Sequence, residues 1–335
     1  MAHPATKSRR IVAALLAVLA AGAPLAAESL AESREATPHA SAGLAFPAAA
    51  RVPAGAGSRV AVIVLENKGY SQLIGNPAAP YLNSLARRYA LATRDFAVGH
   101  PSLPNYLALT AGSTFGVRRD CHACSFGGAD LLTELGSAGI SWKVYVSGVP
   151  SSCYRGLRAA GYVKPLDPFL YFDRIARSRR ACSRVVPMSA ISSDLRAGTL
   201  PRFSWLTPSL CQDTHFCSVR SGDRFLSKLV PPLLRGLGPE GTLFVLWDEG
   251  TSRRGCCGAP GGGHVPAIVA GPEVRRGYRI GAPMNQYTIL RALESAFGVR
   301  PLRHARSVRA APLQAAVADR LQVRGSGRAG LAASG

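Results

Sequence analysis

The chain has 335 residues, with 40 Lys and Arg residues against 19 Asp and Glu residues and a formal net charge of +21. Hydrophobic residues make up 47% of it. That share is enough for a large core, and it excludes low-complexity, collagen-like and coiled-coil proteins. The positive charge favours anionic substrates or surfaces, but it does not choose among nucleic acids, phospholipids and small phosphate esters.

The two ends of the chain differ from its middle. Residues 1–27 predict an export signal, because a basic start precedes the apolar run Ile11–Ala21 and small residues follow it. This run is too short for a stable membrane span. Residues 28–57 predict a flexible linker, and residues 301–335, basic and without aromatic residues, predict a disordered tail. We therefore expect a folded domain at residues 58–300 of a secreted or periplasmic protein.

Between these ends, apolar runs of strand length alternate with helical patterns. The predicted strands are Arg59–Leu65, Ser141–Val146, Arg202–Leu206, Thr242–Trp247 and Val265–Ala270. The predicted helices are Tyr81–Tyr89, Asn105–Thr110, Ala129–Ala138, Arg224–Leu237, Tyr287–Phe297 and, within the tail, Pro312–Val323. Continuous apolar strands separated by helices predict an α/β fold with a mostly parallel central sheet and helices on both faces.

Eight cysteines all lie between Cys121 and Cys257. An even number in an exported chain favours disulfides that support the loops. The pairs that we expect are Cys211–Cys217 and Cys153–Cys182. Two other motifs, Cys121-x-x-Cys124 and Cys256-Cys257, are also compatible with a metal or redox site, but no second CxxC completes a zinc site. Disulfides are the favoured interpretation for all eight.

Acidic residues follow two of the strongest predicted strands. Arg59–Leu65 runs directly into Glu66, and Thr242–Trp247 runs directly into Asp248 and Glu249. Adjacent carboxylates at the end of a buried strand repel each other and lose hydration, and a divalent cation reverses both penalties. A single acidic residue would be interpreted as the solvated start of a loop. Two strand ends together favour a metal site, at the sheet edge where ligands of such folds bind.

Two further clusters supply nitrogen and oxygen ligands. Asp213-x-His215 lies between Cys211 and Cys217, whose pairing would hold it rigidly, and His264 directly precedes the strand Val265–Ala270. Both histidines also fit ordinary loop positions. Carboxylate and imidazole ligands suit zinc, manganese or iron, and an oxygen-rich site also accepts calcium or magnesium. The sequence therefore predicts one or more divalent metal ions without fixing their identity.

Ser102 is the candidate nucleophile. It lies just before a predicted helix, where the helix dipole and free N–H groups favour an anion. A serine hydroxyl placed there against a metal ion can ionise and attack phosphorus. The alternative is that Ser102 is only the N-cap of that helix, which is a common role for serine.

Taken in order, these motifs resemble the alkaline-phosphatase superfamily, and more closely the secreted phosphoesterase family that includes bacterial phospholipases C and acid phosphatases. The matching segments span roughly residues 60–300: VIVLEN, HPSLPNYLALTAGS, SWKVYV, TPSLCQDTHFCSVRSGD, LWDEG, GGGHVPAIVAGP and QYTILRALESAFGV. The resemblance implies an alkaline-phosphatase-like fold and hydrolysis of a phosphate ester, rather than binding of a specific nucleic acid.

The resemblance also implies a role for each candidate residue. Ser102 would be the nucleophile, activated by a metal bound to Glu66, Asp248 and Glu249. A second metal site, or contacts to the phosphate and leaving group, would come from Asp213, His215 and His264. Hydrogen bonds to the phosphoryl oxygens would come from Asn67 and Asn105, and Asp223 would support the site from outside.

The chain departs from many relatives at two positions. Leu166 and Gln286 stand where those relatives have histidines that would face the active-site cleft.

The hypothesis that we favour is a metal-dependent acid phosphatase. A phospholipase C-like diesterase, and a non-catalytic binding protein that keeps the fold, are the alternatives. No exposed apolar loop for a lipid is evident in the sequence.

Overall fold

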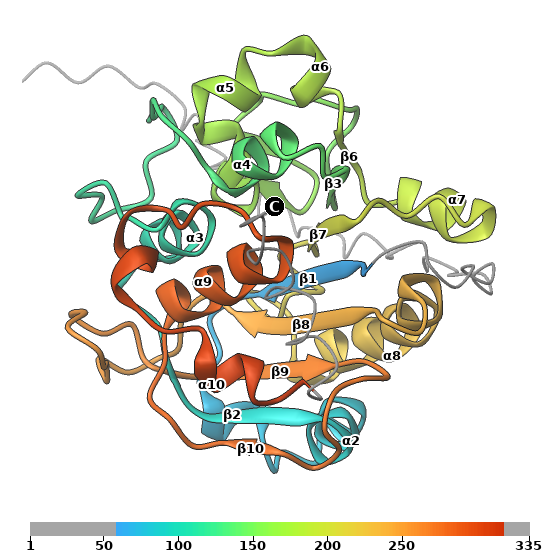
Figure 1. Ribbon diagram of the computed structural model, residues 1–335, viewed down its shortest axis with the longest axis vertical. Coiled ribbons are helices and arrows are strands. Elements are labelled where there is room, and N and C mark those ends of the chain that lie inside the picture. Colours follow the sequence, from blue (N-terminus) through green and yellow to red (C-terminus); the bar gives the residue numbers. More distant parts are fainter. Residues whose placement is uncertain (1–57, 318–335) are drawn as a thin grey trace, which may run out of the picture. The chain divides into compact units, whose positions relative to one another are not determined.

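The computed structural model describes residues 58–317 of the chain. The expected export signal and linker, and residues 318–335 of the expected tail, lie outside this range. Within it, eight strands form one sheet in the order β10-β2-β9-β8-β1-β7-β3-β6, and a separate hairpin pairs β4 with β5 (Figure 1). The strands are β1 Val60–Leu65, β2 Ala90–Phe96, β3 Trp142–Val146, β4 Arg158–Ala159, β5 Tyr162–Val163, β6 Val185–Pro187, β7 Phe203–Thr207, β8 Thr242–Trp247, β9 His264–Ala270 and β10 Arg279–Ile280.

The sheet is mostly parallel, as predicted. Of its eight strands, only β9 runs antiparallel to its neighbours, β8 and β2. The helices that cover it are α1 Tyr70–Leu73, α2 Pro80–Arg88, α3 Ser102–Ala111, α4 Leu131–Ser137, α5 Asp173–Ala176, α6 Arg179–Cys182, α7 Ala190–Ala197, α8 Val219–Leu237, α9 Gln286–Phe297 and α10 Ala311–Gln314, with 3₁₀ turns η1 Lys164–Leu166, η2 Pro168–Tyr171 and η3 Arg303–Ser307.

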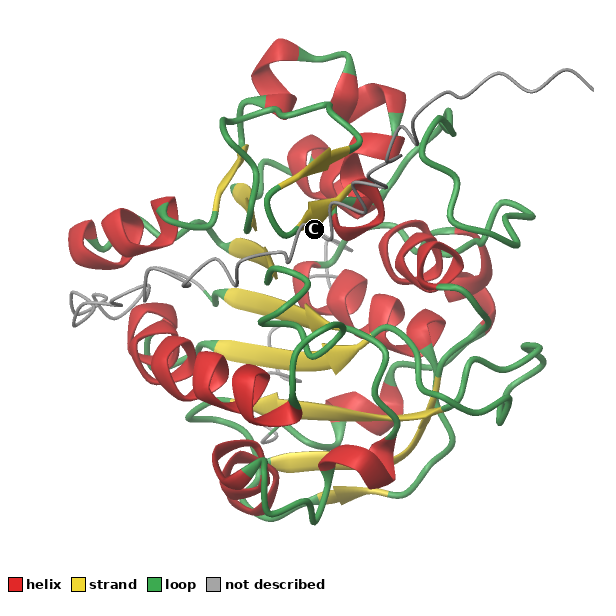
Figure 2. Cartoon of the chain, turned by 180° about the vertical axis from the view of Figure 1, so that it is seen from behind, coloured by secondary structure: helices red, strands yellow, loops and turns green. Residues whose placement is uncertain are grey.

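The central strand β1 is apolar throughout because it lies between two cores. All six of its residues are buried. Val62 packs in the core that includes α3, α4 and α9, whereas Ile63 packs in the opposite core with α2, α7 and α8. Figure 1 shows α3 and α9 on one face of the sheet, and Figure 2, seen from behind, shows the opposite face. Alternating side chains therefore face different helices, so no position of β1 is polar.

All five predicted strands are present, each within a residue of its expected bounds. The sequence missed three strands of the main sheet. β6 and β10 are short, and the apolar pattern of β2 is interrupted at its partly exposed Thr93 and Arg94. The direction of β9 was also not predictable, because a strand that is buried on both faces has the same composition in either direction.

The expected boundary at residue 300 falls short of the folded part. Leu302, Ala305, Leu313 and Ala316 are buried in the same core as α3 and α9. The prediction of a disordered tail is therefore wrong for residues 302–316. Small Ala side chains and single Leu residues fill this contact, so the segment lacks the aromatic residues that usually mark a buried one.

Every cysteine is in a disulfide within the described residues. The two expected pairs, Cys153–Cys182 and Cys211–Cys217, are confirmed. The other four also pair, as Cys121–Cys124 and Cys256–Cys257, so none of these sulfurs is free to bind a metal. In the described range, no helix is both long and apolar enough to cross a membrane.

Glu294 on α9 ties the C-terminal segment to the core and provides a test of stability. Its Oε1 accepts a hydrogen bond from the Leu302 backbone N–H at 2.7 Å. Burial raises the pKa of this carboxyl from 4.5 to about 7. Between these pH values the folded state holds a proton that the unfolded state has lost. The free energy of unfolding should therefore fall as pH rises, by at most about 1.4 kcal/mol per pH unit.

The variant Glu294→Gln keeps the acceptor and removes the ionisation. We expect a flatter dependence of unfolding free energy on pH between pH 4.5 and 7, measured by urea denaturation. Glu240→Gln, at an exposed position, should keep the wild-type slope. If the unfolding free energy of Glu294→Gln depends on pH as steeply as that of the wild type, Glu294 is not the group that titrates between these pH values.

Candidate active site

The predicted site residues gather at one edge of the sheet. This edge holds the carboxyl ends of β1, β7 and β8, the first residue of the antiparallel β9, and the start of α3 after β2. It is the edge at which ligands bind in open α/β sheets. Parallel pairing of β1 with β7 and β8 brings together residues from the segments at 66–67, 213–215 and 248–249, which are far apart in sequence.

Glu66 follows β1 and is buried. Its Oε2 lies 2.8 Å from Nδ1 of His215, and its backbone N–H donates to the Asp213 carbonyl at 2.9 Å. The next residue, Asn67, adopts the left-handed conformation (φ 58°) that Asn tolerates better than most residues. Its Nδ2 lies 2.6 Å from the same His215 nitrogen. Glu66 and Asn67 therefore both face His215.

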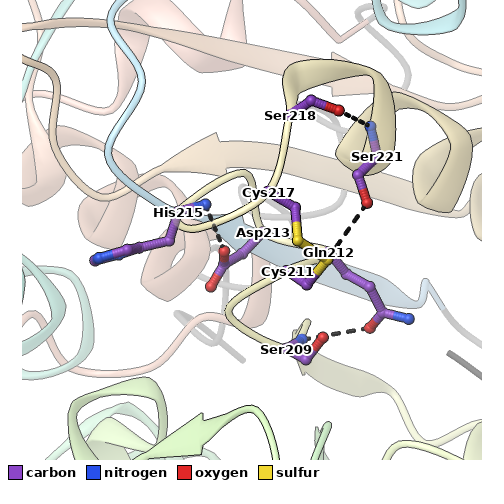
Figure 3. Close-up of a disulfide and its surroundings, with 8 residues drawn as sticks. All are labelled: Ser209, Cys211, Gln212, Asp213, His215, Cys217, Ser218 and Ser221. Carbon is purple, nitrogen blue, oxygen red and sulfur yellow. Dashed lines mark hydrogen bonds between the residues drawn. A yellow bond between two sulfur atoms is a disulfide. The ribbon is translucent and has the colours of Figure 1, made fainter. Parts of the chain in front are cut away.

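The loop after β7 presents Asp213 and His215 (Figure 3). Oδ1 of the buried Asp213 accepts a hydrogen bond from the His215 backbone N–H at 2.8 Å, and the disulfide Cys211–Cys217 closes the loop on both sides of them. Thr214, also in the left-handed region, donates its hydroxyl hydrogen to the Glu66 carbonyl at 3.0 Å. The disulfide and these hydrogen bonds fix the loop against the end of β1.

Asp248 and Glu249 follow β8 and are both buried. Oδ1 of Asp248 accepts from the Asn67 backbone N–H at 3.1 Å, and Oε2 of Glu249 lies 2.8 Å from Nδ1 of His100. Burial raises the pKa of Asp248 well above its usual range, and repulsion from Glu66 and Glu249 adds to this effect. The carboxylates are thus close enough to repel one another.

Ser102 is the first residue of α3 and is buried beside Asp248, whose pKa its hydroxyl lowers. The N-cap of the helix is Pro101, so the alternative role of Ser102 as the N-cap is excluded. The loop before it is held by close backbone contacts with the glycine loop 261–263. A Cβ on Gly262 would meet the Gly99 carbonyl oxygen at 1.9 Å, so only glycine fits there.

The donor set of the cluster fits a divalent cation. Glu66 Oε1, Asp213 Oδ2 and Asp248 Oδ2 are buried without a hydrogen-bond partner of good geometry. Carboxylate oxygens left unpaired in this way are costly unless a cation binds them. In the described part of the chain, however, no three His, Cys, Asp or Glu side chains are already grouped closely enough to hold a metal ion.

Three of the candidate side chains have other contacts. His264 lies at the same sheet edge, but its Nε2 is 2.9 Å from the Thr93 carbonyl oxygen and its ring stacks on Tyr70. The Asn105 amide donates to the carbonyl oxygens of Gly99 and Pro101. Asp223 accepts from the backbone N–H groups at the start of α2, so it supports that helix rather than the site.

The two positions that depart from relatives differ in location. Gln286, at the start of α9, donates to the Asp248 carbonyl at 2.8 Å and accepts from the Val98 N–H at 3.0 Å. It therefore links the end of β8 to the loop that leads to Ser102. Leu166 is fully buried in the apolar core, so the expectation that this position faces the cleft is wrong for this chain.

Sequence reasoning missed three residues at this edge. His100 pairs with Glu249. The hydroxyl of Tyr106 on α3 is buried near Glu66, Asp248 and Asp213, and burial and these charges raise its pKa well above the ordinary value. Phe216, next to His215, is 75% exposed. The first two lie within the motif HPSLPNY, whose histidine and tyrosine were the available signal.

The family model of the Phosphoesterase family matches residues 72–300 of the chain. The chain belongs to this family. It is 31% identical over 247 residues to the phosphatidylinositol-3-phosphatase of Mycobacterium tuberculosis, covering 72% of this chain and 77% of that protein. It is 26% identical to a probable acid phosphatase of Kluyveromyces lactis, covering 57% of this chain but only 47% of that protein.

Among solved structures, a protein in the alkaline phosphatase superfamily from Vibrio parahaemolyticus matches with a TM-score of 0.50 and 14% identity, covering 78% of this chain and 72% of that chain. This match confirms the alkaline-phosphatase-like fold. Membership of the Phosphoesterase family, together with the relatives named as phosphatases, confirms the expected enzyme class, a hydrolase that acts on phosphoric ester bonds.

Two disulfides provide a matched test of the loop that carries Asp213 and His215. Cys211–Cys217 joins residues 6 apart and Cys153–Cys182 joins residues 29 apart. The chain-entropy model then predicts that the free energy of unfolding falls by about 2 kcal/mol without Cys211–Cys217 and by about 3.5 kcal/mol without Cys153–Cys182. Stability should therefore fall more when the longer loop is opened.

We expect the opposite order for activity. Cys211→Ser with Cys217→Ser frees the loop at the site and should lower kcat for p-nitrophenyl phosphate by at least about tenfold. Cys153→Ala with Cys182→Ala should leave kcat within about twofold in the folded protein. Equal effects of the two double variants on kcat would show that the disulfide Cys211–Cys217 does not position the site.

Proposed function

We propose that this protein is a metal-dependent phosphatase of the extracytoplasmic space, with Ser102 as its nucleophile. The observation that carries this proposal is the position of Ser102 at the first turn of a buried helix, beside buried carboxylates with unpaired oxygens. Four disulfides and the predicted export signal support the location, because disulfides persist outside the reducing cytosol.

The residues that would hold the metal are Glu66, Asp248, Glu249, Asp213 and His215. When bound, a divalent cation would supply the positive charge that stabilises an ionised serine and the phosphoryl oxygens. His264 is a weaker ligand because its imidazole is directed at the Thr93 carbonyl. The chemistry of the donors fits zinc, manganese or iron, and also calcium or magnesium.

The reaction would proceed in two displacements at phosphorus. Ser102 Oγ gives its proton to solvent water and attacks phosphorus, forming a Ser–O–P bond while the bond to the leaving alcohol oxygen breaks in line with it. That oxygen takes up a proton from solvent water as the alcohol departs. Water then attacks the phosphoserine and restores the Ser102 hydroxyl with release of phosphate. The N-terminus of α3 favours the negative charge on the phosphoryl group.

Two asparagines take different parts in this proposal. Nδ2 of Asn67 and Oε2 of Glu66 both face Nδ1 of His215, and this nitrogen cannot donate to Glu66 and accept from Asn67 at once. We propose that Asn67 donates an N–H to a phosphoryl oxygen. Asn105 donates to the Gly99 and Pro101 carbonyls and accepts from the Gly99 N–H at 3.1 Å. It therefore positions the loop that carries Ser102, rather than contacting the substrate as the sequence suggested.

A phosphorylated lipid headgroup is a second candidate substrate. It is favoured by the name of the Mycobacterium tuberculosis relative, a phosphatidylinositol-3-phosphatase, and by the exposed Phe216 beside His215. A panel of phosphate monoesters, diesters and phosphatidylinositol 3-phosphate in vesicles distinguishes the soluble-substrate, diesterase and lipid-phosphatase alternatives.

Replacement of Ser102 tests its proposed role as the nucleophile. Ser102→Ala should lower kcat by at least about a thousandfold, since it removes the attacking oxygen. Ser113→Ala, just beyond the other end of α3, should keep a near-normal kcat. Acid quenching of the wild type with labelled substrate should trap phosphate on Ser102. A near-normal kcat for Ser102→Ala would end the phosphoserine mechanism.

Replacement of Asp248 and Glu249 tests the proposed metal site. Asp248→Asn with Glu249→Gln should abolish both stoichiometric metal, measured by elemental analysis, and activity. The metal-free variant should be at least as stable as the metal-free wild type, because the substitutions relieve carboxylate repulsion. Glu240→Gln should retain metal and activity. Full metal content in the double variant would show that these residues are not the ligands.

A further inference from the structure

A cavity of about 820 Å³ adjoins the candidate active site. It begins at His100, two residues before Ser102, and at Pro104 in the first turn of α3. Its other walls come from the loop after α3, the loop between β8 and β9, the start of α9 and the segment around η3. This volume lies within the range of about 300 to 1,000 Å³ for small-molecule sites. It is much larger than a phosphate group requires.

The charged residues that line this cavity are two arginines. Arg118 and Arg253 line it together with His100 and His304, and none of its lining residues is Asp or Glu. Neither arginine forms an ion pair or side-chain hydrogen bond with any residue of the described range 58–317. The two exposed guanidinium groups come from different loops, and each can attract an anion and bind it in bidentate fashion.

The remaining wall is suited to the body of a ring-shaped molecule. The rings of Tyr287 and His304 lie 5.2 Å apart, and Val117 and Pro260 add apolar surface. The cavity thus combines apolar and aromatic surface with two arginines, and it adjoins the segment that carries Ser102.

The loop that carries Arg253 is held in place before any ligand binds. The disulfide Cys256–Cys257 lies within it. The Gly263 N–H donates to the Arg254 carbonyl at 2.9 Å, and the Gly262 N–H donates to the Ala97 carbonyl at 2.7 Å. Because this loop packs on the segment that leads to Ser102, the backbone next to Arg253 is held near the proposed nucleophile, while its exposed side chain is free to reach a ligand. A preformed site loses less conformational entropy on binding.

We propose that this cavity binds the leaving group of the substrate, and that Arg118 and Arg253 bind a second anionic group on it. The proposal rests on the phosphatase function proposed above and narrows its substrate class. The preferred substrates are phosphate monoesters of ring-shaped alcohols that carry a further phosphate or carboxylate. After the ester bond breaks, the anionic alcohol leaves through the cavity and phosphate remains at Ser102.

A series of three aryl phosphates tests this inference. Phenyl phosphate, 4-carboxyphenyl phosphate and 4-(aminomethyl)phenyl phosphate share a ring and differ in the charge at its far end. For the wild type we expect kcat/KM to be at least about tenfold higher for the carboxyl than for the aminomethyl compound, the size expected of a charge-assisted contact. The three leaving groups also differ in reactivity. We therefore compare the ratio of kcat/KM for the carboxyl compound to that for the aminomethyl compound between the wild type and its variants.

Arg118→Gln with Arg253→Gln should reduce this ratio at least about fivefold while leaving kcat/KM for phenyl phosphate within about threefold. Arg235→Gln, which removes an unpaired exposed charge near the end of α8, should leave the ratio unchanged. Calorimetric binding of the corresponding non-hydrolysable phenylphosphonates should show the same order of dissociation constants, and this readout does not depend on turnover.

The outcomes separate this inference from the proposed function. Hydrolysis of all three esters with a ratio that Arg118→Gln and Arg253→Gln do not change would overturn the inference and leave the phosphatase proposal standing. A ratio that falls equally in Arg235→Gln would also overturn it, because net charge would then be the cause. The third outcome is that no ester is hydrolysed, while phosphonate binding depends on charge and requires the two arginines. This result would support the binding site and overturn the phosphatase proposal.

Discussion

The burial of four carboxylates at one edge of the sheet is the constraint around which the rest of the site is arranged. Glu66, Asp213, Asp248 and Glu249 are all at most 7% exposed. Each loses hydration there, and each repels the others. Such a cluster is tolerated only if its backbone is fixed by other interactions. Those interactions are the hydrogen bonds that join β1 to β7 on one side and to β8 on the other.

Two loops complete this frame from opposite sides. On one side, the disulfide Cys211–Cys217 and the Thr214 hydroxyl hold Asp213 and His215 against β1. On the other, the glycine loop 261–263 packs against the chain that leads to Ser102, so closely that a Cβ on Gly262 could not fit. Both loops fix the positions of candidate site residues before a substrate arrives, which is the condition for effective electrostatic stabilisation.

The location of the site was predictable from the sequence, whereas the direction of individual side chains was not. The apolar runs of β1 and β8 are unambiguous, and the acidic residues that follow them must lie at a common edge if the strands are parallel. Asn105 and His264 fit the same motifs, yet their polar atoms bind backbone carbonyls. Which partner a side chain meets depends on tertiary packing, which residue type and spacing do not encode.

Tertiary packing also decides the roles of Gln286 and of the C-terminal segment, which the sequence alone did not predict. A glutamine in place of the expected histidine suggested a lost function, but its amide joins the Asp248 and Val98 backbones, a role for which glutamine has both a donor and an acceptor. The segment from Leu302 to Ala316 has the composition of a disordered tail. It is ordered because α3 and α9 leave an apolar surface that its few Leu and Ala side chains cover.

The charge distribution also bears on how this fold can bind a phosphate ester. The chain carries a net charge of +21, yet Ser102 lies beside the buried Asp248, which interacts with Glu66 and Glu249. A phosphate dianion approaching Ser102 would therefore be repelled at short range, even though the protein attracts it from a distance. The cavity that Arg118 and Arg253 line does not include Glu66, Asp213, Asp248 or Glu249 among its lining residues, so these arginines are not part of the carboxylate cluster. Positive charge among the carboxylates themselves would remove this repulsion, so the metal that we propose would serve substrate binding as well as activation of the serine.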